Sequence, residues 1–108
     1  MSRREERVGA VFQALSDPTR RQVVALLSRS GPVTATELAG RLPVSRQAVS
    51  KHLAALADAG LVTAAREGRE VRYRLTPPPM RDAMSWMATV GAEWDDRLQA
   101  LQRHLRRR

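Results

Sequence analysis

Ser45-Arg-Gln-Ala-Val-Ser-Lys-His-Leu53, followed by Leu56 and by Ala59-Gly-Leu-Val62, is the stretch of sequence that decides the fold. On a helix that advances ~100° per residue, Val49, Leu53 and Leu56 lie on one side. This spacing predicts an amphipathic helix over residues 45–59, which ends at a glycine that leads into a strand.

The polar side of this helix has the side-chain types that recognise DNA. Gln47 and Lys51 lie opposite the apolar stripe, with Ser50 beside them. Gln, Ser, Lys and Arg side chains read base edges or hold phosphates in a major groove. The alternative is an ordinary amphipathic helix with a solvated polar face. The candidate DNA contacts on this helix are Ser45, which also suits the N-cap, Arg46, Gln47, Ser50, Lys51 and His52, the last at the flank of the face.

A second, shorter helix is predicted just before it. Thr34-Ala-Thr-Glu37 matches a capping box that opens a helix to residue 42, and Pro43-Val44 forms the turn. Two helices joined by so tight a turn predict a helix-turn-helix over residues 34–59. A helical hairpin in any small bundle would show the same pattern, so this pair does not decide the function alone.

Two strands are predicted after the helix-turn-helix, over residues 61–66 and 71–75, with Gly68 in the turn. Val71, Tyr73 and Leu75 alternate with arginines, which is typical of a half-buried strand. A hairpin in this position is a wing spanning residues 61–75, and its arginines Arg69 and Arg72 are candidate DNA contacts. Arg69 is the candidate for a minor groove, which favours arginine where it is narrow. Alternatively these arginines only solubilise the hairpin, since two glutamates lie beside them.

Helices are also predicted over residues 4–15, 18–27 and 78–106. Asp17 suits the N-cap of the second of these, and Pro18 its first turn. The last has a ~3.5-residue apolar repeat, with a second apolar stripe alongside. So long a helix has more apolar surface than one small core covers, so part of it should meet another subunit; the alternative is that it folds back onto its own domain. The repeat consists of Met80, Met84, Met87, Gly91, Trp94, Leu98, Leu101 and Leu105.

The composition is that of one small folded domain over residues 1–108. The formal net charge is +8, which favours a polyanionic partner such as nucleic acid. The chain has no cysteine, which excludes disulfides and thiolate metal sites. It also has no long apolar run and no apolar segment at its N-terminus, so we expect a cytoplasmic protein without a membrane partner.

The order of these elements resembles the ArsR family of bacterial winged-helix repressors, over residues 11–105. This resemblance implies a winged helix-turn-helix fold, mainly helical with a small hairpin in the order α-α-α-α-β-β-α. It also implies a homodimer that binds a palindromic operator in double-stranded DNA. The residues that carry it are Leu15-Ser-Asp-Pro-Thr-Arg-Arg21, Val44-Ser-Arg-Gln-Ala-Val-Ser-Lys-His-Leu53, Ala59-Gly-Leu-Val62, and Gly68-Arg69 with Tyr73.

In this family the first and last helices form the dimer interface. The corresponding candidates are Val8, Val11, Phe12, Met84, Met87, Trp94, Leu98 and Leu101. Many relatives sense metals, but this chain lacks the cysteines of one site type. It also has Gln102 where a second site type would have an acidic residue two positions before His104. We therefore expect no metal and no cofactor, and the sequence does not indicate an inducer.

A homodimeric DNA-binding repressor is the function that these observations favour. A winged-helix protein-interaction module that has lost DNA binding is one alternative, and a basic nucleic-acid-binding protein without operator specificity is another. An enzyme is not expected, because the chain has no catalytic Ser-His-Asp or Cys-His set and no glycine-rich phosphate loop.

Overall fold

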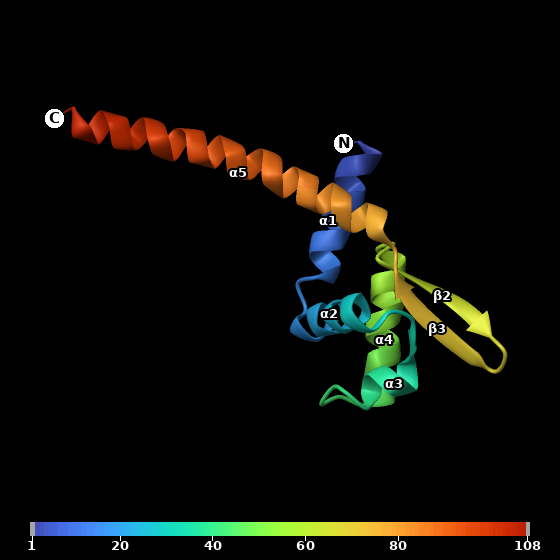
Figure 1. The fold of residues 1–108 in the computed structure, drawn as a ribbon. Helices are drawn as coiled ribbons and strands as arrows, with labels where there is room; N and C mark the ends of the chain where they lie inside the picture. The colour runs from blue at the N-terminus through green and yellow to red at the C-terminus, as the bar shows by residue number, and fades with distance from the viewer. Residues whose placement is uncertain (1, 108) are drawn as a thin grey trace.

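The computed structural model describes residues 2–107 as a winged helix-turn-helix with a long C-terminal helix (Figure 1). Helices α1 and α2 come first, α3 and α4 form the helix-turn-helix, β2 and β3 form the wing, and α5 ends the chain. The elements are α1 (Arg3–Ala14), α2 (Pro18–Ser30), β1 (Val33–Thr34), α3 (Ala35–Ala39), α4 (Arg46–Asp58), β2 (Val62–Glu67), β3 (Glu70–Leu75) and α5 (Pro77–Arg106).

The N-caps predicted from the sequence are present at the starts of three helices. Asp17 accepts a hydrogen bond from the Arg20 backbone N–H at 3.0 Å, and Pro18 opens α2. Thr34 and Ser45 accept from the third residue of α3 and α4, each at 3.1 Å. These bonds satisfy N–H groups that have no partner within the helix, so they fix where each helix begins.

Two predicted helix ends are wrong. Helix α2 continues three residues past residue 27, because polar residues prolong it until Gly31, which has a φ of 74°. This left-handed conformation is open to glycine at little steric cost, and it ends the helix. Helix α3 is shorter than predicted and ends at Ala39, so the turn before α4 is correspondingly longer.

The sheet has a third strand that the sequence did not indicate. Strand β1 pairs antiparallel with β3, and the order in the sheet is β1-β3-β2. Thr34 lies opposite Arg72 in this register, one residue before α3. The wing is thereby joined by backbone hydrogen bonds to the start of the helix-turn-helix.

The core lies where α1, α2, α3 and α4 meet the base of the wing. Val49, Leu53 and Leu56 of α4 have no exposed surface, which confirms the predicted apolar face. Val11 is also fully buried and Val8 is 6% exposed. Both belong to the protomer's own core on the inner face of α1, and Val8 also lines the spaces between α1 and α5.

Helix α5 packs on α1 only through its first turns. Arg4 and Arg7 of α1 each approach Asp82 at 3.9 Å, and Ala83 is buried between the helices. The rings of Phe12 and Trp86 meet edge to face, with centroids 5.5 Å apart. Beyond this contact the helix projects away from the body (Figure 1), and residues 91–107 are exposed. It does not fold back on its own domain.

Among the described residues, none of the helices combines the length and hydropathy needed to cross a bilayer.

Candidate nucleic-acid interface

The exposed face of α4 presents a compact polar surface. Gln47, Ser50 and Lys51 are exposed on the side of the helix opposite the buried stripe. Because the buried stripe fixes the rotation of α4 about its axis, these three side chains have to point outward. We call Gln47, Ser50 and Lys51 the reading face.

Ser45 and Arg46 lie at the N-terminal end of the reading face. The Ser45 hydroxyl oxygen accepts the hydrogen bond that caps α4. The Arg46 Nε donates to the Thr36 hydroxyl at 3.0 Å, which directs its guanidinium toward α3. The four remaining N–H donors of a guanidinium are suited to a phosphate. Both residues therefore lie where a DNA backbone would pass if the reading face entered a groove.

A groove of about 480 Å³ separates the reading face from the wing. Arg46 and Ser50 line one side, and Arg69 lines the other from the turn of the hairpin. The turn is formed by Gly68, whose φ is 64°. The structure thus brings two predicted contacts of α4, Arg46 and Ser50, and the predicted contact Arg69 at the wing tip to one groove.

His52 does not belong to this surface. Its side chain is 20% exposed, and its Nδ1 lies 3.8 Å from the carboxylate of Asp17 at the start of α2. The hydrogen bond from the Arg20 backbone N–H, aided by His52, lowers the pKa of Asp17 from its ordinary value. One step along α4 from Lys51 turns the His52 side chain toward α2, so its predicted contact with DNA stays a prediction.

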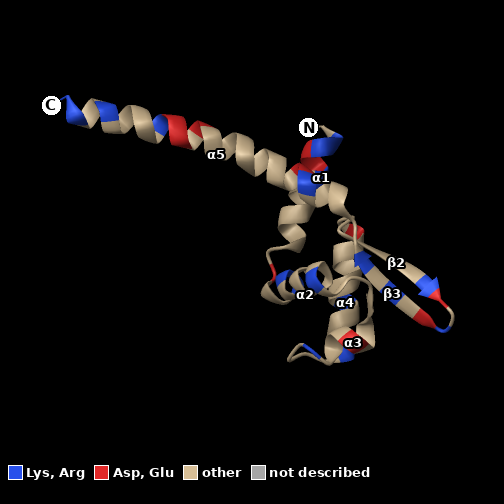
Figure 2. Ribbon diagram, in the orientation of Figure 1, with Lys and Arg blue, Asp and Glu red and all other residues tan. Residues whose placement is uncertain are grey.

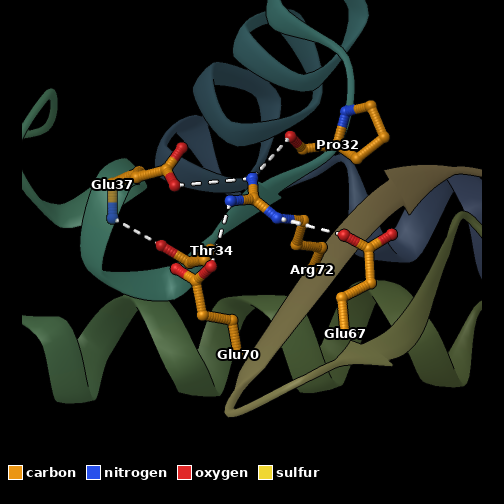
Figure 3. Close-up of polar contacts among 6 residues, drawn as sticks. All are labelled: Pro32, Thr34, Glu37, Glu67, Glu70 and Arg72. Carbon is orange, nitrogen blue, oxygen red and sulfur yellow. Dashed lines mark hydrogen bonds and ion pairs between the residues drawn. The ribbon is translucent and has the colours of Figure 1, made fainter.

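Arg72, which was also predicted to contact DNA, lies among carboxylates of its own chain (Figure 3). Its side chain is 28% exposed, and its guanidinium is surrounded by the carboxylates of Glu37, Glu67 and Glu70. The nitrogen–oxygen distances are 3.5, 3.3 and 3.2 Å, respectively. Alternation along β3 placed Arg72 on the outer face of the hairpin, where Glu37 of α3 and the carbonyl oxygen of Pro32 also reach it.

Arg20 and Arg21 cap the end of α1, a role that was not predicted from the sequence. Arg21 donates to the carbonyl of Leu15 at 2.6 Å, and Arg20 donates to that of Ala14 at 3.4 Å. These carbonyls lie at the end of α1, where no helical N–H is available to them. The signal was present in the stretch Asp17-Pro-Thr-Arg-Arg21, in which two arginines follow directly on a helix stop.

Positive charge is spread over the surface, and the wing mixes both signs (Figure 2). Arginines lie on α2, near the turn before α4, and at the wing tip, where glutamates interrupt them. Within residues 2–107 there is no cluster of three or more His, Asp or Glu side chains with the placement to hold a metal ion. The exposed side chains of the reading face and the wing tip are of types that can bind anions and base edges.

Comparison with known proteins gives the same picture. A family model described as a helix-turn-helix domain matches residues 15–64. The transcriptional repressor SdpR of Bacillus subtilis is 36% identical over 77 residues, covering 71% of this chain and 84% of that protein. The arsenical resistance operon repressor of Escherichia coli is 35% identical over 101 residues, covering 90% and 83%.

A solved structure of an ArsR-like transcriptional regulator from Rhodococcus is also similar. It is 43% identical, with 92% of each chain covered and a TM-score of 0.77. The similarity therefore extends beyond the helix-turn-helix and includes the wing and much of α5.

Substitutions on the reading face and at His52 should have different effects, the first on affinity for DNA and the second on thermal stability. Gln47→Ala and Lys51→Ala should each weaken binding to a recognised duplex by about 1–3 kcal/mol, since each removes a group placed for base or phosphate contact. His52→Ala should instead lower the melting temperature and leave the relative affinities for different duplexes unchanged. Fluorescence anisotropy titrations and thermal unfolding measure both effects.

Gln99→Ala is the matched control, because Gln99 is exposed on α5 away from the apolar repeat. If Gln47→Ala and Lys51→Ala bind as tightly as this control, the reading face is not a DNA contact.

Proposed function

This chain belongs to the ArsR family of winged helix-turn-helix transcriptional regulators, and we propose that it represses transcription as a homodimer on a palindromic operator. It is a DNA-binding transcriptional repressor and not an enzyme. The observation that carries the proposal is the reading face: three exposed polar side chains on a helix whose opposite side has no exposed surface.

Helix α4 enters the major groove in this proposal. Gln47 is suited to adenine, and Lys51 to guanine or to a phosphate, because these pairings match the donors and acceptors on the base edges. Ser45 and Arg46 hold the backbone beside the helix. Arg69, at the wing tip, inserts into the minor groove next to the major groove that α4 occupies.

The dimer forms through the apolar surface that a single copy leaves exposed. Trp86, Trp94 and Leu98 are 50%, 62% and 50% exposed, which is unusual for residues of this size on one surface. Phe12 of α1 is 36% exposed and adjoins Trp86, so the surface continues from α5 onto α1. The remaining members are Met84, Met87, Leu101 and Leu105.

A second copy of α5 is the occupant that fits this surface. A twofold axis at Gly91 would cross two copies of the helix, with Leu98 of one opposite Met84 of the other and Trp94 beside Met87. Nothing lies within 4 Å of a Cβ built on Gly91 in the single chain, so its lack of a side chain favours close approach by another helix. The outer half of α5 then reaches the spaces of about 400 and 380 Å³ between the partner's α1 and α5.

Dimerisation also doubles the net positive charge that is available to attract DNA. Two copies carry twice +8, or +16, which attracts a duplex and makes affinity fall steeply with salt. Such a repressor acts where the chromosome is, in the cytoplasm.

Operator binding is the direct test of this function. In a selection from a random-sequence DNA library, the protein should enrich a palindrome whose half-sites lie about 10 bp apart, one turn of the helix. A mobility-shift titration of the selected duplex against a scrambled one then measures specificity. Equal affinity for both duplexes would indicate a general nucleic-acid-binding protein, and no binding at all would favour the protein-interaction module.

Leu98→Asp should convert the dimer to monomers, because it places a charge in the centre of the apolar surface. Sedimentation velocity measures the change, and Gln99→Asp is the matched control, which adds the same charge one residue away on the outer side of α5. If Leu98→Asp remains as dimeric as Gln99→Asp, the interface lies elsewhere.

A further inference from the structure

The wing is attached to the rest of the protein by few contacts beyond its base. Strand β1 contributes only Val33 and Thr34 to the sheet, and they pair with Tyr73 and Arg72 of β3. The half of the hairpin that approaches DNA, from residue 66 to residue 71, lies beyond this pairing. Its direction relative to α4 therefore depends on side-chain contacts at the junction.

Arg72 makes those contacts at the junction (Figure 3). Its Nη1 lies 3.5 Å from Glu37 of α3 and 3.4 Å from the carbonyl oxygen of Pro32, before β1. Its Nε and Nη2 lie 3.3 Å from Glu67 and 3.2 Å from Glu70, at the two sides of the wing turn. One guanidinium thus connects both wing strands to the first helix of the helix-turn-helix.

The backbone of Glu37, the partner of Arg72 on α3, is held by the cap of that helix. Glu37 is in the first turn of α3, where its backbone N–H donates to Thr34. Thr34 is paired with Arg72 across the sheet and is only 8% exposed. The guanidinium fork is planar and rigid, so binding to several oxygens also sets its orientation.

The charges around Arg72 and Arg69 also distinguish these two wing arginines. Three carboxylates around one guanidinium leave the junction negative, which would repel a phosphate brought against Arg72. Arg69, at the wing tip, is exposed and lines the groove that faces α4. The two wing arginines therefore differ in what they can contact.

We propose that Arg72 is a positioning residue, which holds the wing against α3 through Glu37 so that Arg69 reaches the DNA together with the reading face. Arg72 itself contacts no DNA. This inference rests on the proposed function, and it adds the residue that sets the spacing between the two DNA-contacting elements.

Glu37→Gln gives the most discriminating result. If Arg72 merely supplied positive charge, removing a neighbouring carboxylate would tighten binding. If Arg72 positions the wing, the same change loosens the wing and weakens binding to the selected operator by about two- to fivefold. Asp58→Asn is the matched control, since it also removes one exposed carboxylate, at the end of α4 away from the wing tip and from Arg72. It should bind as tightly as the wild type or slightly more tightly.

A double-mutant cycle tests whether Arg72 acts through Arg69. Arg69→Gln and Arg72→Gln should each weaken operator binding about tenfold, and the double variant should be at most about twofold weaker than Arg69→Gln alone. Two independent phosphate contacts would instead multiply to about a hundredfold. Anisotropy titrations of the full chain on the selected duplex give all four affinities, and thermal unfolding verifies that each variant is folded.

The outcomes separate the two proposals. If the wild-type protein binds none of the selected duplexes, the proposed function is wrong. Specific binding by the wild type, combined with tighter binding by Glu37→Gln or a multiplicative cycle, would overturn only the positioning role of Arg72.

Discussion

The burial of one face of α4 is the constraint on which the rest of the structure depends. Val49, Leu53 and Leu56 have no exposed surface, so α4 cannot rotate without exposing them to water. Exposing a side chain of this kind costs about 1.5–3 kcal/mol, and three of them make the orientation firm. The reading face is the geometric consequence of this packing, because it occupies the side of the helix that the core leaves open.

Local patterns in the sequence were sufficient to predict most elements. Helix α4, its Ser45 cap and the two strands of the wing follow from spacing and capping, which involve residues close together in the chain. Two helix ends were misjudged, because polar residues neither require nor forbid a further turn. Strand β1 was missed because a two-residue strand has no periodicity to detect.

The surroundings of the predicted site residues have a different physical origin. His52 and Arg72 were assigned to DNA from their own sequence neighbours, but Asp17 and Glu37, which lie 35 residues before them, determine where they point. Val8 and Val11 were predicted at a subunit interface from the family resemblance, and the fold packs them in the protomer's own core. In each case the decisive partner is distant in sequence, so that only the folded chain reveals it.

Methylation interference on the selected operator tests the placement of α4 in the major groove most directly. Methylation of guanine N7 alters the major groove only, and methylation of adenine N3 alters the minor groove. Guanine N7 methylation should block binding in both half-sites, with adenine N3 interference confined to the flanking positions that the wing reaches. Interference at adenine N3 alone, with guanine N7 methylation tolerated throughout the site, would contradict entry of the reading face into the major groove.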